Sequence, residues 1–156
     1  MSQTCFVSNI GGEKCPGPVD EVSYSNQATL SGLMEIPLNK PDKEEIYNTS
    51  HEINIEKLVS ISVRRPRGKK VLTTGTFTPS ISYISRTDQQ TVHNYHQDLP
   101  FQILIKKNDG THLEPDFALN QFVAYICVEF QNYQQVDERT ITYEIVLLFW
   151  LQKING

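Results

Sequence analysis

The histidines and cysteines of this chain carry the side chains best suited to metal binding and nucleophilic chemistry. His93 and His96 are the only two histidines close together in the sequence, in the segment HNYHQD. Residues three apart on an extended strand point to opposite faces, so these two do not easily chelate one ion. His96 and Asp98 share a face, but two ligands fall short of a closed zinc site. The sequence therefore predicts no metal site and no bound cofactor.

The three cysteines are Cys5, Cys15 and Cys127. An odd number leaves at least one thiol free or paired with another chain. Cys127 lies within a strongly apolar segment and is expected to be an inert core thiol. Cys5 and Cys15 lie in the first 25 residues. There they are either exposed thiols on a disordered tail or intersubunit disulfide partners.

The sequence lacks the short motifs of the common nucleophilic, nucleotide-binding and zinc enzymes. It contains no G-x-S-x-G elbow, no P-loop, no G-x-G-x-x-G, no C-x-x-C and no H-E-x-x-H. A dyad of Cys127 with a histidine has no support in the local sequence. We therefore expect a protein that is not an enzyme.

Length and charge limit the classes of function further. The 156 residues suit one domain plus a tail, and 14 basic against 18 acidic residues give a net charge of −4. This balance offers no electrostatic reason to bind nucleic acid or an anionic membrane. The apolar run Ile145–Leu151 is too short to span a bilayer, which needs about 20 apolar residues. Met1–Gly12 has no basic start and no apolar run, so no signal peptide is expected.

Residues 1–25 differ in composition from the rest of the chain and predict a flexible N-terminal arm ahead of a body at 26–156. This segment is rich in glycine, proline and serine and has no sustained hydrophobic period. An arm of this kind can cross to a neighbouring subunit and be fixed there by disulfides or strand addition. Phe6, Val7 and Ile10 would be its apolar anchors.

The segment Glu138–Gln152 is the element around which the body is expected to form. Its first half alternates, with Ile141, Tyr143 and Ile145 on one side of an extended chain. Its second half is continuously apolar, which indicates burial on both faces, as in the middle of a sandwich or barrel. A buried helix is the alternative, but β-branched and aromatic residues favour a strand.

Five further segments are predicted to be extended, and Asp42 with Glu45 resembles a capping box that would open one short helical turn. Val71–Ser85 is interrupted at Gly75 and Pro79, and Thr91–Lys107 is broken at Pro100. The remaining three segments are Ala28–Ile36, Ile53–Arg65 and Asn120–Tyr133, and in the last of these Ala124, Ile126, Val128 and Phe130 are expected to share one face. Together the strands predict an all-β fold, an antiparallel sandwich or barrel-like single domain.

Five cations fall within the seven residues from Arg64 to Lys70. One interpretation is a solvated hairpin tip, and the other is a docking patch for an acidic partner. That patch would consist of Arg64, Arg65, Arg67, Lys69 and Lys70.

Four stretches in order carry a resemblance to a known family: Lys40–Ile46 (KPDKEEI), Val71–Ser85, Thr91–Phe101 (TVHNYHQDLPF) and Glu138–Phe149 (ERTITYEIVLLF). Over about Leu30 to Leu151 the chain resembles a single SPOCS domain, the module of spore coat and spore morphogenesis proteins in anaerobic endospore-forming bacteria. The cysteine-bearing arm lies outside that pattern. In arrangement alone it is similar to the N-terminal connectors of endospore appendage subunits.

The resemblance implies a structural protein made in the mother cell and assembled on the spore surface, in the coat, the exosporium or an appendage. Its partners would be further copies of itself or other spore envelope proteins, with no nucleic acid and no membrane span. One alternative is a monomeric adaptor that docks a spore-morphogenesis protein. Another is a carbohydrate-binding module, for which Tyr83, Tyr95 and Tyr133 are the candidate exposed aromatics.

Overall fold

The structure is a computed structural model, and it describes residues 10–18, 22, 24–37, 43–64, 67–85, 92–107 and 111–154. Extended backbone dominates these ranges, and one short 3-10 turn, Leu119–Gln121, precedes the seventh strand. The strands are β1 (Ile10–Glu13), β2 (Tyr24–Glu35), β3 (Lys43–Arg64), β4 (Arg67–Ser85), β5 (Val92–His96), β6 (Leu99–Lys107), β7 (Phe122–Gln135) and β8 (Thr140–Lys153).

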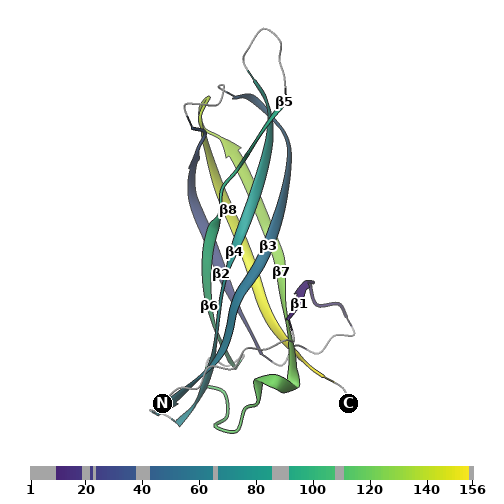
Figure 1. The fold of residues 1–156 in the computed structure, drawn as a ribbon, viewed down its shortest axis with the longest axis vertical. Helices are drawn as coiled ribbons and strands as arrows, with labels where there is room; N and C mark the ends of the chain where they lie inside the picture. The colour runs from purple at the N-terminus through teal and green to yellow at the C-terminus, as the bar shows by residue number, and fades with distance from the viewer. Residues whose placement is uncertain are drawn as a thin grey trace.

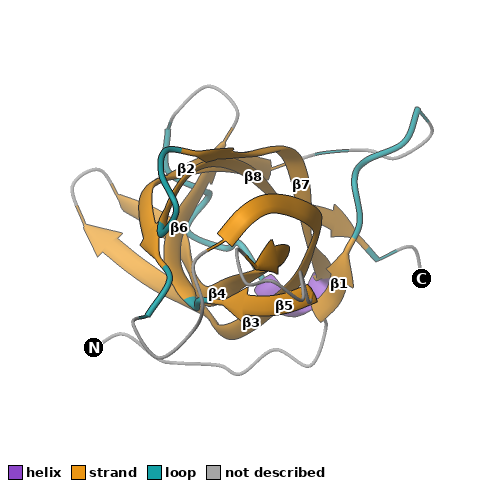
Figure 2. Ribbon diagram, turned by 90° about the horizontal axis from the view of Figure 1, so that it is seen from above, coloured by secondary structure: helices purple, strands orange, loops and turns teal. Residues whose placement is uncertain are grey.

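The strands form an elongated cylinder (Figure 1) that is nearly closed when seen along its long axis (Figure 2). Neighbouring strands follow the order β1-β7-β8-β2-β6-β4-β3. Strand β5 lies off this path and pairs with residues 80–84 of β4. All described pairs are antiparallel except β1 with β7, which is parallel. The all-β sandwich or barrel predicted from the alternating segments is therefore confirmed.

Strand β8 occupies the middle of one half of this sheet, as its composition predicted. It pairs with β7 on one side and with β2 on the other. Its inward residues Ile145, Leu147, Phe149 and Leu151 are fully buried, because they fill the interior of the cylinder. Trp150 points the other way and is also fully buried, so something outside the sheet must cover it.

Strand β4 supplies the opposite wall and runs without a break through Gly75 and Pro79, where the sequence had predicted interruptions. Its residues alternate strictly between buried and partly buried positions from Val71 to Tyr83. Gly75 is required because a Cβ there would lie 2.2 Å from the carbonyl oxygen of Asn54 and 2.6 Å from the ring of Phe101. Close approach of two strands, and not a turn, explains this glycine.

Three further local expectations are wrong. Strand β3 already begins at Lys43, in place of a helical turn at Asp42–Glu45. The break between β5 and β6 falls after His96, and Pro100 lies inside β6 opposite Thr76. Finally, a register shift in β7 between Val128 and Phe130 turns Phe130 outward, leaving it 50% exposed.

Candidate functional site

The segment Ile10–Cys15, which we call the strap, extends the sheet as an edge strand beside β7 and ends over the outer face of β7 and β8, instead of extending away as part of a flexible arm. Its strand β1 runs parallel to β7, with Ile10 opposite Ala124 and Glu13 opposite Ile126. The Lys14 amide continues the pairing by donating to the carbonyl of Ile126 at 2.8 Å. The expectation of an arm unconnected to the body is therefore wrong for this part of the chain.

Two glycines let the strap approach the sheet. A Cβ on Gly11 would lie 2.1 Å from the ring of Tyr125, so a side chain at this position would displace either the strap or the ring. Gly12 has a φ of +90°, a left-handed conformation that glycine adopts without steric cost. The register shift between Ile10 and Gly12 falls at the same place.

The strap covers the outward face of Trp150. The indole N–H donates to the carbonyl oxygen of Lys14 at 2.8 Å. The indole also stacks on Tyr125, with ring centroids 4.8 Å apart. The Lys14 ammonium lies 4.9 Å from the centre of the Tyr125 ring and 5.7 Å from that of Trp150. This cover explains why the outward-facing indole is buried.

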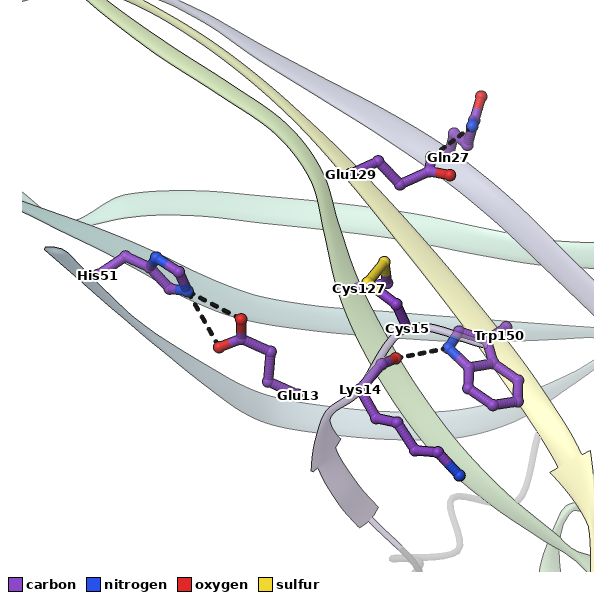
Figure 3. The surroundings of a disulfide bond; sticks show 8 residues. All are labelled: Glu13, Lys14, Cys15, Gln27, His51, Cys127, Glu129 and Trp150. Carbon is purple, nitrogen blue, oxygen red and sulfur yellow. Dashed lines mark hydrogen bonds and ion pairs between the residues drawn. A yellow bond between two sulfur atoms is a disulfide. The ribbon is translucent and has the colours of Figure 1, made fainter. Parts of the chain in front are cut away.

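A disulfide between Cys15 and Cys127 closes the end of the strap on β7 (Figure 3). The two residues are 112 positions apart, and their Cα atoms are separated by 4.5 Å. Cys127 is therefore not the free core thiol expected from the sequence, and Cys15 pairs within its own chain instead of with a neighbouring subunit. Alternation along β7 places Cys127 on the outer face with Tyr125, which is the face that the strap contacts. This position explains why the sulfur of Cys127 meets that of Cys15.

A second contact joins the strap to β3 across the remaining seam of the cylinder. His51 Nε2 lies 2.9 and 3.0 Å from the two carboxylate oxygens of Glu13, and its Nδ1 lies 3.2 Å from the side-chain nitrogen of Gln131. The tautomer with its proton on Nε2 donates to the Glu13 carboxylate and accepts from the Gln131 amide at Nδ1. The ring also stacks on Phe77, with centroids 5.3 Å apart. Side chains therefore connect β1 and β7 to β3 at this seam.

Backbone pairing is absent from the same seam over the described ranges, in which β3 pairs with β4 alone. A hollow of about 300 Å³ lies here, between the strap and residues Ile53–Ile55 of β3. Strand β2 has a second open stretch, since it pairs with β6 only at Tyr24 and Ser25. Tyr47 on β3 and Leu33 on β2 are 67% and 58% exposed. The cylinder thus presents two strand edges with large apolar side chains on the surface.

The remaining predicted arm and patch residues are only partly described. Cys5, Phe6, Val7 and Arg65 lie outside the described residues. Ile10, predicted to anchor the arm on a neighbour, pairs within its own chain.

The described cations lie at the β3–β4 hairpin, where Arg64 and Arg67 face each other in register and are exposed. Lys69 donates to the carbonyl of Phe117 at 2.9 Å, and Lys70 is partly buried. The predicted patch is therefore a hairpin end in which one cation is used internally.

The three tyrosines considered for carbohydrate binding do not form an exposed row. Tyr83 is fully buried and faces the interior. Tyr133 is half-buried, and desolvation raises its pKa to about 12. Tyr95 is partly buried, and burial followed by the nearby Glu35 carboxylate raises its pKa. Stacking on a sugar needs open aromatic faces, and these three tyrosines do not provide them.

Neither a metal cluster nor a membrane-spanning helix occurs in the part of the chain that the structure describes. No group of three or more histidine, cysteine, aspartate or glutamate side chains gathers there as a metal site. Within the same ranges, no helix has the length and apolarity needed to cross a membrane.

Sequence reasoning missed the residues that anchor the strap, namely Glu13, Lys14, His51, Tyr125 and Trp150. One signal was present, because Trp150 falls on the outward parity of β8 and an outward tryptophan needs a cover or a partner. The adjacent glycines at positions 11 and 12 are a second signal, because glycine permits close approach to a neighbouring ring as well as flexibility.

No family model matches this sequence, and comparisons with characterised proteins and with solved structures found no significant similarity.

Proposed function

We propose that this protein is a self-assembling structural subunit of a spore surface layer or fibre, in the coat, the exosporium or an appendage. The observation that supports assembly is the length of open strand edge. Strand β3 extends over 22 residues and, within the described ranges, shares its backbone hydrogen bonds with β4 alone. The spore surface as the location rests on the SPOCS-like stretches of the sequence.

An open edge favours assembly because its unpaired N–H and C=O groups can pair with another strand. Proteins that stay monomeric protect such edges with charges, prolines or short strands. From Tyr47 to Ser50, ahead of its middle, β3 carries only neutral residues. Charges follow at Glu52, Glu56 and Lys57, so the stretch without such protection is the one around Tyr47. The two open edges belong to different strands, so contact between them is head-to-tail. A head-to-tail contact that does not close into a ring produces a filament.

The N-terminal arm gives a second link, through Cys5. The disulfide between Cys15 and Cys127 leaves Cys5 as the one remaining thiol of the chain. A single thiol per chain joins two chains at most, so covalent linkage through Cys5 stops at the dimer. Further growth must then come from non-covalent strand pairing.

The test is the mass of the purified full chain in solution, measured by light scattering at several concentrations and followed by electron microscopy. We expect the mass to rise with concentration and ordered layers or fibres to appear. A mass that stays that of the monomer at every concentration would contradict assembly.

Two variants separate the arm from the edges in this measurement. Deleting residues 1–9 removes Cys5, Phe6 and Val7 but keeps the strap and its disulfide, and Cys5→Ser removes only the thiol. We expect Cys5→Ser to abolish the dimer band on non-reducing gels without preventing assembly. Normal assembly of the deletion variant would remove the arm from the proposal and leave the strand edges as its sole basis.

A monomeric adaptor is the second candidate, because the exposed Arg64 and Arg67 rim a hollow of about 290 Å³ beside Pro115 at the hairpin end. This site would take an acidic protein segment. For an adaptor the mass stays that of the monomer at every concentration, and charge reversal by Arg64→Glu and Arg67→Glu abolishes binding to such a partner. Loss of assembly in this variant would instead place the hairpin end in the subunit contact.

A further inference from the structure

The strap buries little apolar surface of its own, and a disulfide ties its end to β7. Ile10, Gly11, Glu13, Lys14 and Cys15 are all exposed, and β1 has only four residues, with a shifted register. A segment that buries so little apolar surface has a low free energy of local opening. Of the non-covalent contacts that position the strap, the one between Glu13 and His51 is exposed to water, and the hydrogen bond from Trp150 to the Lys14 carbonyl is part-buried.

We propose that the Cys15–Cys127 disulfide is a reducible latch, whose reduction releases the strap from the outer face of β7 and β8 while the body of the cylinder stays folded. This inference is independent of the proposed function, because it concerns a movement within one chain.

The exposure of the two cysteines indicates where reduction begins. Cys15 is exposed, whereas Cys127 is 3% exposed and lies beneath the strap. A thiolate arriving from solvent therefore reaches the sulfur of Cys15 first.

A dithiol reductant supplies both electrons. Its first thiolate attacks Cys15 Sγ, forms a mixed disulfide and expels Cys127 as a thiolate, which takes a proton from water. Its second thiolate then attacks the mixed disulfide, releases Cys15 as a thiol after protonation, and leaves the reductant as its own disulfide.

Release of the strap has two structural consequences. The outer face of Trp150 loses its cover, because both the Lys14 carbonyl and the Lys14 ammonium move away with the strap. The edge of β7 from Ala124 to Ile126 loses its partner, because it is paired with β1. The reduced state therefore presents a stacked aromatic pair, Tyr125 and Trp150, beside an unpaired strand edge. This combination is suited to strand addition by an extended segment.

The body does not need the strap for its own pairing. Strand β7 pairs with β8 over its whole length, from Phe122 to Gln135, and β8 pairs with β2 from the other side. None of the residues of the larger buried core belongs to the strap. Because the larger buried core lies entirely outside the strap, the strap can open while the core stays packed.

Trp150 is the single tryptophan of the chain, so its fluorescence reports directly on the latch. The experiment uses the full chain carrying Cys5→Ser, so that the only disulfide is Cys15–Cys127, before and after treatment with dithiothreitol. A double variant, Cys15→Ser with Cys127→Ser, mimics the reduced state without reductant. Loss of the disulfide is checked by mass, and strand content by far-ultraviolet circular dichroism.

On reduction we expect tryptophan emission to shift to longer wavelength and quenching by acrylamide to rise several-fold, with unchanged circular dichroism. Hydrogen exchange should increase in the strap and at the edge of β7, and stay unchanged in β8. Unchanged emission and quenching after complete reduction would overturn the proposal, since the strap would then be held without its disulfide. Collapse of the circular dichroism signal would overturn it equally, since the disulfide would then support the whole fold.

Discussion

The indole N–H of Trp150 donates a hydrogen bond to the backbone carbonyl of Lys14 over 2.8 Å, although the two residues are 136 positions apart. This contact joins the residue that follows β1 to the last strand, β8, on the outside of the cylinder. A buried indole N–H without a partner costs free energy, so the strap both covers the apolar ring and satisfies its one polar atom. The outer face of β8 therefore depends on a segment that sequence composition alone assigned to a free tail.

Replacing Trp150 by phenylalanine should destabilise the protein by about 1–3 kcal/mol, because the hydrogen bond to Lys14 and part of the stacking on Tyr125 are lost. Urea unfolding followed by circular dichroism measures the change in the free energy of unfolding. The matched control is Phe130→Leu, a change of an exposed aromatic on the neighbouring strand, which should alter stability by less than about 0.5 kcal/mol. Equal effects of the two substitutions would show that the strap contact contributes nothing to stability.

Removing the disulfide by Cys15→Ala with Cys127→Ala should cost about 2–4 kcal/mol and lower Tm by about 5–15 °C, because the bond closes a long loop in the unfolded chain. Thermal unfolding without reductant gives both values. Cys5→Ala is the control, and it should leave Tm unchanged. A double variant as stable as the parent would mean that the unfolded chain is not restricted by this bond.

The strand content of the body could be predicted from the sequence because alternation is a local signal. The alternation of β4 and the apolar run of β8 each required only their own residues. The strap could not be found in this way, since β1 contains one large apolar residue and two glycines, and its partner lies more than 100 positions away. Three cysteines allow three different pairs, and only the fold brings Cys15 to Cys127.

Sequence periodicity also missed two details that depend on strand register. These are the outward turn of Phe130 and the position of the break before β6. A bulge depends on how two strands are in register, and it flips every side chain beyond it to the other face. Sequence periodicity continues across Phe130 as if the bulge did not exist. The open edge of β3 was likewise invisible, because the identity of a strand's neighbours is a property of the whole sheet.

Tyr47→Lys should weaken self-assembly if the open edge of β3 is the contact between copies. Tyr47 is 67% exposed on that strand, and a lysine on an edge opposes pairing with a second strand through its charge and its hydration. The measurement is the dependence of mass on concentration by light scattering, which should shift to higher protein concentration. Val136→Lys adds the same charge beyond the end of β7 and serves as the control. Identical curves for the two variants would place the contact elsewhere.

Ionisation of Tyr133 should destabilise the protein at alkaline pH. Desolvation raises the pKa of its phenol to about 12 in the folded chain, against about 10 in an unfolded one. Below pH 10 the phenol is neutral in both states and folding is unaffected. Between about pH 10 and 12 the unfolded chain releases this proton first, so it binds fewer protons than the folded chain, and stability falls as pH rises.

Tyr133→Phe removes this ionisation, so the variant should lose less stability than the parent between pH 9 and pH 11.5, measured by urea unfolding at each pH. Tyr24 and Tyr95 also have raised pKa values, mainly through burial. Both are present in the parent and in the variant, so their effects cancel when the two free energies of unfolding are subtracted at each pH. The phenol of Tyr133 donates to the side chain of Gln131 at 3.0 Å, and loss of that bond shifts the whole curve without changing its slope. Parallel curves for the two proteins would therefore show that the folded environment of Tyr133 does not disfavour its charge.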